Sequence, residues 1–206
     1  MKKILTTLFF SLVALFSVWG QSNLTPPQVL DRSVKAISEN KGMELIFNVT
    51  TSGYTGKGEI LTLGKKFKVK LPDVNIWYNG KDLYTYSGDT GETTVMIPTE
   101  EELAESNPLA YITGAEKNYN VSFSTVKKQG SYVLELIPAA KNANLKRVTL
   151  TVGKNNFIPE RIVVEPKSGD PIRADILSYK KVSSVSSSEF EYPKSKYPKA
   201  EIVDLR

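Results

Sequence analysis

The sequence predicts a mainly β fold of about eleven antiparallel strands, with helical signatures at two places. Apolar and polar residues alternate from residue 43 to residue 50, which is the pattern of a half-buried strand. Similar runs follow at intervals of roughly ten residues, separated by connectors rich in Gly, Asn and Asp. These runs lie near 57–63, 66–71, 74–78, 82–86, 92–97, 119–126, 131–137, 145–152, 159–165 and 171–180.

The connectors are short, so neighbouring strands should pair antiparallel. The sharpest turn signal is Asn79-Gly80, which predicts a type I′ hairpin between 74–78 and 83–86. The serine-rich stretch 183–188 is too polar to pair in a core, and we interpret it as a surface loop. The apolar residues that follow it, from Phe190 to Leu205, predict that the tail returns to the sheet as an edge strand.

Two segments have helical signatures. The first begins with Thr25 as N-cap and Pro26 at the first helical position, and ends near Gly42. The second follows a capping box that starts at Thr99, between Pro98 and Gly114. Each segment carries apolar residues that would pack on one side. Such segments fit a lid or a plug, and their apolar residues include Leu30, Val34, Ile37, Leu103, Leu109 and Ile112.

The first twenty residues predict a secretory signal peptide. Lys2 and Lys3 precede an apolar run of about 15 residues, which is shorter than the roughly 20 that span a bilayer. We expect cleavage after Gly20 and a single domain over residues 21–206. The chain contains no Cys, so it has neither disulfides nor a site for a lipoprotein anchor, and we expect the exported protein to be unanchored.

Composition argues against most enzyme classes. The chain has neither His nor Cys, which removes the commonest general base, the thiol nucleophile and the usual zinc ligands. We expect no metal and no cofactor. An enzyme using carboxylates stays an alternative, with Glu100 and Glu102 or Glu189 and Glu191 as the acids. The net charge of +5 is spread along the chain, so we expect no nucleic-acid partner.

The predicted strands have more apolar inner surface than two short helical segments can cover. Such a sheet either curls around a cavity closed by the helices or fills its interior with its own side chains, and the residues leave both open. If there is a cavity, its lining is predicted to be Phe47, Val49, Phe67, Val69, Trp77, Tyr84, Tyr86, Val121, Phe123, Leu134, Leu136 and Leu150.

The order and spacing of several pieces resemble the LolA-like family of periplasmic outer-membrane lipoprotein carriers. They are Gly58-Glu59-Ile60-Leu61-Thr62-Leu63, Lys66-Phe67-Lys68, Trp77-Tyr78-Asn79-Gly80-Lys81, Leu83-Tyr84-Thr85-Tyr86, Val95 with Ile97 and Pro98, Asn107-Pro108-Leu109, Leu136-Ile137-Pro138, Phe190-Glu191-Tyr192-Pro193 and Ile202-Val203-Asp204-Leu205. The resemblance implies an incomplete β-barrel with a helical lid, whose concave face binds acyl chains.

The resemblance also implies partners. The protein would be a monomer in the periplasm that takes acylated lipoproteins from an inner-membrane ABC lipoprotein-releasing transporter to an outer-membrane acceptor. Better-known members carry an Arg-Pro pair before the Phe, with the arginine associated with latching the lid, whereas this chain has Lys65-Lys66 before Phe67. The alternative is a sensory or regulatory module that binds lipids or lipoproteins with the same fold.

Overall fold

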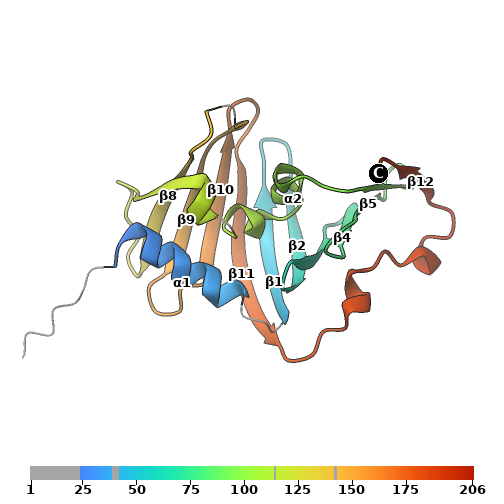
Figure 1. Ribbon diagram of the computed structural model, residues 1–206, viewed down its shortest axis with the longest axis horizontal. Coiled ribbons are helices and arrows are strands. Elements are labelled where there is room, and N and C mark those ends of the chain that lie inside the picture. The colour runs from blue at the N-terminus through green and yellow to red at the C-terminus, as the bar shows by residue number, and fades with distance from the viewer. Residues whose placement is uncertain (1–23, 39–41, 114, 142) are drawn as a thin grey trace, which may run out of the picture.

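The computed structural model describes residues 24–38, 42–113, 115–141 and 143–206. Within these residues the strands form one 12-stranded sheet, whose edge strands do not pair with each other. The sheet is curved, and helices lie across one of its faces (Figure 1). The fold is therefore an incomplete β-barrel with a helical lid, which confirms the predicted fold class. The signal peptide expected at residues 1–20 lies outside the described residues.

Each run of alternating residues forms a strand, and the tail adds one more. The strands are β1 (Gly42–Thr50), β2 (Thr55–Leu63), β3 (Lys66–Lys70), β4 (Val74–Tyr78), β5 (Leu83–Ser87), β6 (Glu92–Met96), β7 (Tyr119–Phe123), β8 (Ser131–Pro138), β9 (Leu145–Gly153), β10 (Pro159–Pro166), β11 (Ile172–Val182) and β12 (Glu201–Asp204).

Two antiparallel meanders make up the sheet, in the order β12-β6-β5-β4-β3-β2-β1-β11-β10-β9-β8-β7. The seam between them is the pair β1–β11, which joins residues from opposite ends of the chain. The tail strand β12 lies parallel to β6 at one edge, as the apolar tail predicts. At the other edge lies β7.

The lid comes from two separate segments. The first is α1 (Pro26–Ser38), which crosses the face of β8 to β11 (Figure 1). The second comprises α2 (Glu100–Ser106), the 3-10 turn η1 (Pro108–Tyr111) and α3 (Ala115–Asn118), between β6 and β7. Two further 3-10 turns, η2 (Ser187–Phe190) and η3 (Lys194–Lys196), lie in the tail. Among the described residues, no helix combines the length and apolar character needed to cross a membrane.

The hairpin at Asn79-Gly80 forms, but its turn differs from the predicted type I′. The last ladder pair is Tyr78 with Leu83, so the loop has four residues. Gly80 has a positive φ of 101°, whereas Asn79 is not among the residues with positive φ. Instead, the Asn79 Oδ1 accepts hydrogen bonds from the backbone N–H groups of Lys81 and Asp82, at 3.0 and 2.9 Å. The side chain therefore shapes a longer loop.

Candidate functional site

The concave face of the sheet carries a continuous apolar surface. Register fixes one row across it, from Phe123 through Leu134, Leu150, Ile162 and Ala174 to Val49. Successive side chains of a strand point to opposite faces, so each member of this row identifies the concave positions of its own strand. Nine predicted lining residues lie on this face: Phe47, Val49, Phe67, Val69, Val121, Phe123, Leu134, Leu136 and Leu150.

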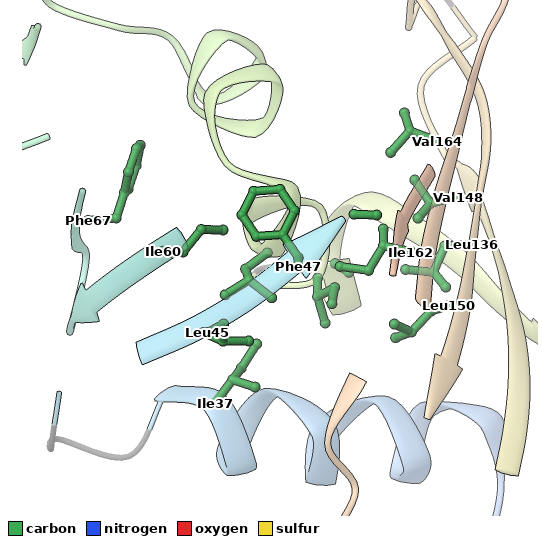
Figure 2. Packing of buried hydrophobic residues seen from close by; sticks show 14 of the residues in the cluster. Ile37, Leu45, Phe47, Ile60, Phe67, Leu136, Val148, Leu150, Ile162 and Val164 are labelled. Carbon is green, nitrogen blue, oxygen red and sulfur yellow. The ribbon is translucent and has the colours of Figure 1, made fainter. Parts of the chain in front are cut away.

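Further buried residues share this face, and sequence reasoning missed them. Figure 2 shows these side chains converging around Phe47. They occupy alternate positions of correctly predicted strands. The period-two pattern, extended through each strand, could have identified them. They are Leu45, Ile60, Val148, Ile162 and Val164.

A glycine makes room for the largest of the central side chains. Gly58 of β2 lies opposite Phe47 of β1. A Cβ atom at Gly58 would lie 2.4 Å from the Phe47 Cζ and 2.8 Å from the Leu71 Cδ2. The missing side chain therefore lets the Phe47 ring lie flat across the neighbouring strand.

The lid packs tightly on this face. All six predicted lid residues belong to or pack against the same apolar cluster: Leu30, Ile37, Leu109 and Ile112 are buried, and Val34 and Leu103 are partly buried. Between the second lid segment and β10–β11 there is a cleft of about 30 Å³, lined by Ala104, Tyr111, Ile162 and Ile172 among others. This cleft is the size of one water molecule. In this closed form, then, side chains fill the concave face, and a long ligand would need the lid to move.

Few polar contacts hold the first lid helix on the sheet. The hydrogen bonds described for its side chains are local, such as Lys35 Nζ to Asp31 Oδ2 at 2.6 Å. A cation–π contact connects α1 to the β9–β10 turn, with the Arg32 guanidinium 5.1 Å from the ring centroid of Phe157. Ser33 is fully buried, and its hydroxyl has no hydrogen-bond partner among the residues that the structure describes. Apolar packing therefore contributes most of what keeps α1 in place.

Three predicted lining residues lie on the wrong face for a shared cavity. Trp77 pairs with Tyr84, and Tyr86 lies two positions further along β5, so their side chains point to the convex face. There they contact the tail, residues 183–206, which we call the strap. The Tyr192 ring stacks on Tyr84 with centroids 5.4 Å apart, and the Tyr197 ring lies 4.1 Å from that of Tyr86. The prediction that they line the concave face is therefore wrong. Register places them on the convex face, which the strap covers.

A polar groove of about 470 Å³ runs between the strap and the convex face. Glu44, Glu59 and Lys70 line its sheet side, and Ser186 and Glu189 line its strap side. Lys68 bridges the two sides, with its Nζ 3.2 Å from the Glu189 Oε2. Its charged lining does not suit a hydrocarbon chain, and the groove is separate from the concave face.

The carboxylates considered for catalysis have structural contacts. Glu102 completes the capping box of α2, and hydrogen bonds from the Thr99 backbone and side chain lower its pKa. Glu189 forms the ion pair with Lys68, and Glu191 accepts a hydrogen bond from Asn79 at 3.1 Å. Within the described residues, no group of three or more acidic side chains is placed to hold a metal ion.

Burial of the lid also affects a tyrosine. Tyr111 in η1 packs against the apolar cluster and lines the small cleft. Burial, with smaller contributions from Glu105, Tyr119 and Glu101, raises the pKa of Tyr111 to about 12. The ionised form is therefore disfavoured while the lid is closed.

Three solved structures are similar to this chain at low sequence identity, and the first of them shares its fold. An uncharacterized conserved protein from Thermus thermophilus has a TM-score of 0.58 and 13% identity, covering 86% of this chain and 98% of that one. A LolA superfamily protein from Nitrosomonas europaea has a TM-score of 0.44 and 13% identity, covering 82% and 99%. A DUF1329 family protein from Desulfovibrio piger has a TM-score of 0.49 and 12% identity, covering 82% and 98%.

The comparison with protein families is the more specific. A search of curated proteins finds no match. The family described as "Outer membrane lipoprotein carrier protein LolA" matches residues 16–167, which is well over half of the chain. Those residues include both lid segments and most of the concave strands. The chain belongs to the LolA family of outer membrane lipoprotein carrier proteins.

Proposed function

We propose that this protein is a periplasmic carrier that shields the acyl chains of lipoproteins and transfers them from the inner to the outer membrane. Its partners would be an inner-membrane ABC lipoprotein-releasing transporter as donor and an acceptor at the outer membrane. Family membership supports the class of function. The structural support is that two helical segments, and no part of the sheet itself, cover the apolar concave face.

The observation that supports the proposal is that apolar lid side chains pack on the concave face. In the proposed function, a hydrocarbon chain takes their place. Leu30, Leu109 and Ile112 are fully or almost fully buried against the concave strands. Removing them would uncover part of the apolar row that crosses the concave strands. An acyl chain can replace these contacts with its own, so the lid and the cargo compete for the same face.

Competition of this kind makes strong binding reversible. Each buried CH₂ group contributes about 0.8 kcal/mol, so one long acyl chain represents roughly 10 kcal/mol of exposure to water. A lid that returns its own apolar residues to the face recovers part of that free energy when the cargo leaves. The closed form therefore helps release as well as protecting the empty face.

The decisive experiment is native mass spectrometry with lipid extraction on protein purified from the cell envelope. We expect a bound acylated species in the wild-type protein and its loss in Phe123→Asp, because Phe123 is on the concave face and 44% exposed. The matched control is Ile137→Asp on the adjoining strand β8, 40% exposed and on the convex face, which should keep the lipid. Equal lipid content in wild type and Phe123→Asp, with both folded, would contradict the site.

A further inference from the structure

Two turns lie side by side at one end of the concave face. The β7–β8 turn covers residues 124–130, and the β9–β10 turn covers residues 154–158. The Lys154 N–H donates a hydrogen bond to the Gly130 carbonyl at 3.0 Å, which ties the two turns together. Arg32 of α1 reaches the second turn through Phe157. We call this end of the molecule the rim, defined by Phe123, Val126, Lys127, Lys128, Lys154 and Phe157.

The rim exposes apolar side chains at its tip. Val126 is 68% exposed, the highest value among the large hydrophobic residues described, and Phe123 is 44% exposed. Single exposed apolar residues are common on protein surfaces. These two, however, follow each other around one turn and are flanked by lysines, which is the arrangement of a surface that contacts lipid headgroups.

Positive charge surrounds these apolar residues. Lys127 and Lys128 are exposed next to Val126, and Lys154 lies on the neighbouring turn with its ammonium 5.3 Å from the Tyr132 ring centroid. The acidic side chains facing the rim are Glu160, which pairs with Lys128 at 2.7 Å, and Glu135, which accepts a hydrogen bond from Ser124 at 2.8 Å. With Arg32 included, the positively charged side chains at the rim outnumber the acidic ones. The charge of the rim is therefore complementary to an anionic surface.

Stacked rings connect the rim to the concave face. The Phe123 and Tyr132 rings are 6.0 Å apart, and the Tyr132 and Phe157 rings are 6.2 Å apart, both nearly parallel. Phe123 also pairs in register with Leu134, the start of the long apolar row. Apolar contacts therefore continue from Phe123 and Phe157 at the rim to the row on the concave face.

We propose that the rim is a docking surface for an anionic lipid bilayer. Val126 and Phe123 insert at the boundary of headgroups and acyl chains, while Lys127, Lys128 and Lys154 lie at the level of the lipid phosphates. This inference goes beyond carriage of acyl chains, because a carrier that meets only its protein partners has no need to touch a bilayer. It also does not depend on the lid opening.

The test is co-sedimentation of the protein beginning at Gln21 with vesicles. Every described element lies within this form, and it lacks the apolar run 4–18 that could insert by itself. We expect binding to vesicles of phosphatidylcholine mixed with phosphatidylglycerol, weakened by salt, and little binding to phosphatidylcholine alone. Lys127→Gln with Lys154→Gln should weaken binding on the order of 25-fold, at about fivefold per charge, and Val126→Asp should also weaken it.

Matched controls replace exposed residues of the same kinds elsewhere. Lys65→Gln with Lys199→Gln removes two exposed lysines, and Ile97→Asp replaces an apolar residue that is 59% exposed; these should bind as wild type does. Equal binding to neutral vesicles, no binding to either kind, or equal losses in rim and control variants would each overturn the proposal. Uptake of a fluorescent fatty acid, measured in parallel, separates this result from the carrier function, since the lysine variants should keep it.

Discussion

Single residues in the lid set how firmly it closes. Ser33 is the clearest case, because its hydroxyl is fully buried on α1 and no described residue forms a hydrogen bond with it. A buried polar group without a hydrogen bond costs about 1–3 kcal/mol. The closed form therefore carries a local cost that an open lid would relieve by hydrating the hydroxyl.

We expect Ser33→Ala to raise the free energy of unfolding in urea by about 1–2 kcal/mol, and to weaken uptake of a fluorescent fatty acid. The control is Ser106→Ala, whose hydroxyl donates a hydrogen bond to the Glu102 carbonyl at 2.8 Å, and which should gain no stability. A loss of stability in Ser33→Ala would show that the hydroxyl is satisfied in solution.

Tyr111 makes the stability of the folded protein depend on pH in the alkaline range. Its folded pKa is about 12 against an ordinary 10, so the folded form holds the proton more tightly than the unfolded form. The stability that this provides is complete below pH 10 and is lost as the pH rises towards 12. In urea unfolding at several pH values, wild type should lose stability over this interval more steeply than Tyr111→Phe. Tyr54→Phe, which removes an exposed tyrosine, should behave as wild type; matching slopes in all three proteins would contradict the assignment.

At the scale of elements, alternation in the sequence was enough to find the strands but not always their faces. In β1 one side is apolar throughout, so the placing of Phe47 and Val49 follows from the pattern. In β4 and β5, Trp77, Tyr84 and Tyr86 are as apolar as their neighbours Ile76, Tyr78 and Leu83, and no alternation marks the inner side. The strap that buries the outer side comes from more than a hundred residues away, where local patterns carry no information.

The contacts that hold α1 on the sheet also depend on tertiary structure. Lys66 lies close to the position where better-known family members have an arginine associated with latching the lid. Its Nζ donates a hydrogen bond to the Ser187 hydroxyl of the strap at 3.3 Å, away from the lid. The contact between α1 and the β9–β10 turn is made by Arg32 on Phe157. Phe157 has a left-handed φ of 56°, a conformation unusual for a bulky residue. Its ring is held in place by Arg32 and Tyr132.

Arg32→Gln should therefore loosen the first lid helix. A cation–π contact at an exposed site contributes about 0.5–1 kcal/mol, so hydrogen exchange of α1 amides should speed up roughly two- to fivefold. Lys35→Gln on the same helix removes a charge whose described ion pair is with Asp31, also on α1, and exchange there should change less. Identical exchange in Arg32→Gln and wild type would show that the contact does not hold the lid.

On the scale of the whole molecule, the strap gives the sheet a second apolar layer. Phe190 is fully buried, and Trp77 contacts both Tyr192 and Tyr197 with ring centroids 5.5 and 5.8 Å apart. The Thr93 hydroxyl donates to the Tyr192 hydroxyl at 2.9 Å. At the end of the chain, Arg206 pairs with Asp204, whose pKa the hydrogen bonds from Arg206 lower to about 2. The ring contacts hold the strap against the convex face, next to the edge where β12 pairs with β6.

Trp77 reports on this layer directly. The chain has two tryptophans, Trp19 and Trp77, so the form beginning at Gln21 contains Trp77 alone, 2% exposed. Tyr192→Ala should shift its fluorescence to longer wavelength and lower the free energy of unfolding by about 1–3 kcal/mol, from lost ring contacts and burial. Tyr54→Ala, far from these rings, should leave the emission unchanged. An unshifted emission in Tyr192→Ala would mean that other residues keep water from the indole.

The position of β11 in the sheet has a consequence for biogenesis. This strand lies between β1 and β10, yet it is made from residues 172–182 of a 206-residue chain. When the chain is made from its amino terminus, β1–β6 and β7–β10 precede β11. Until β11 forms, β1 and β10 each have an unpaired edge. Loop closure over more than a hundred residues makes that final insertion slow. Nascent molecules of this protein should therefore depend on holdase chaperones until residues 172–182 have been made and can pair with β1 and β10.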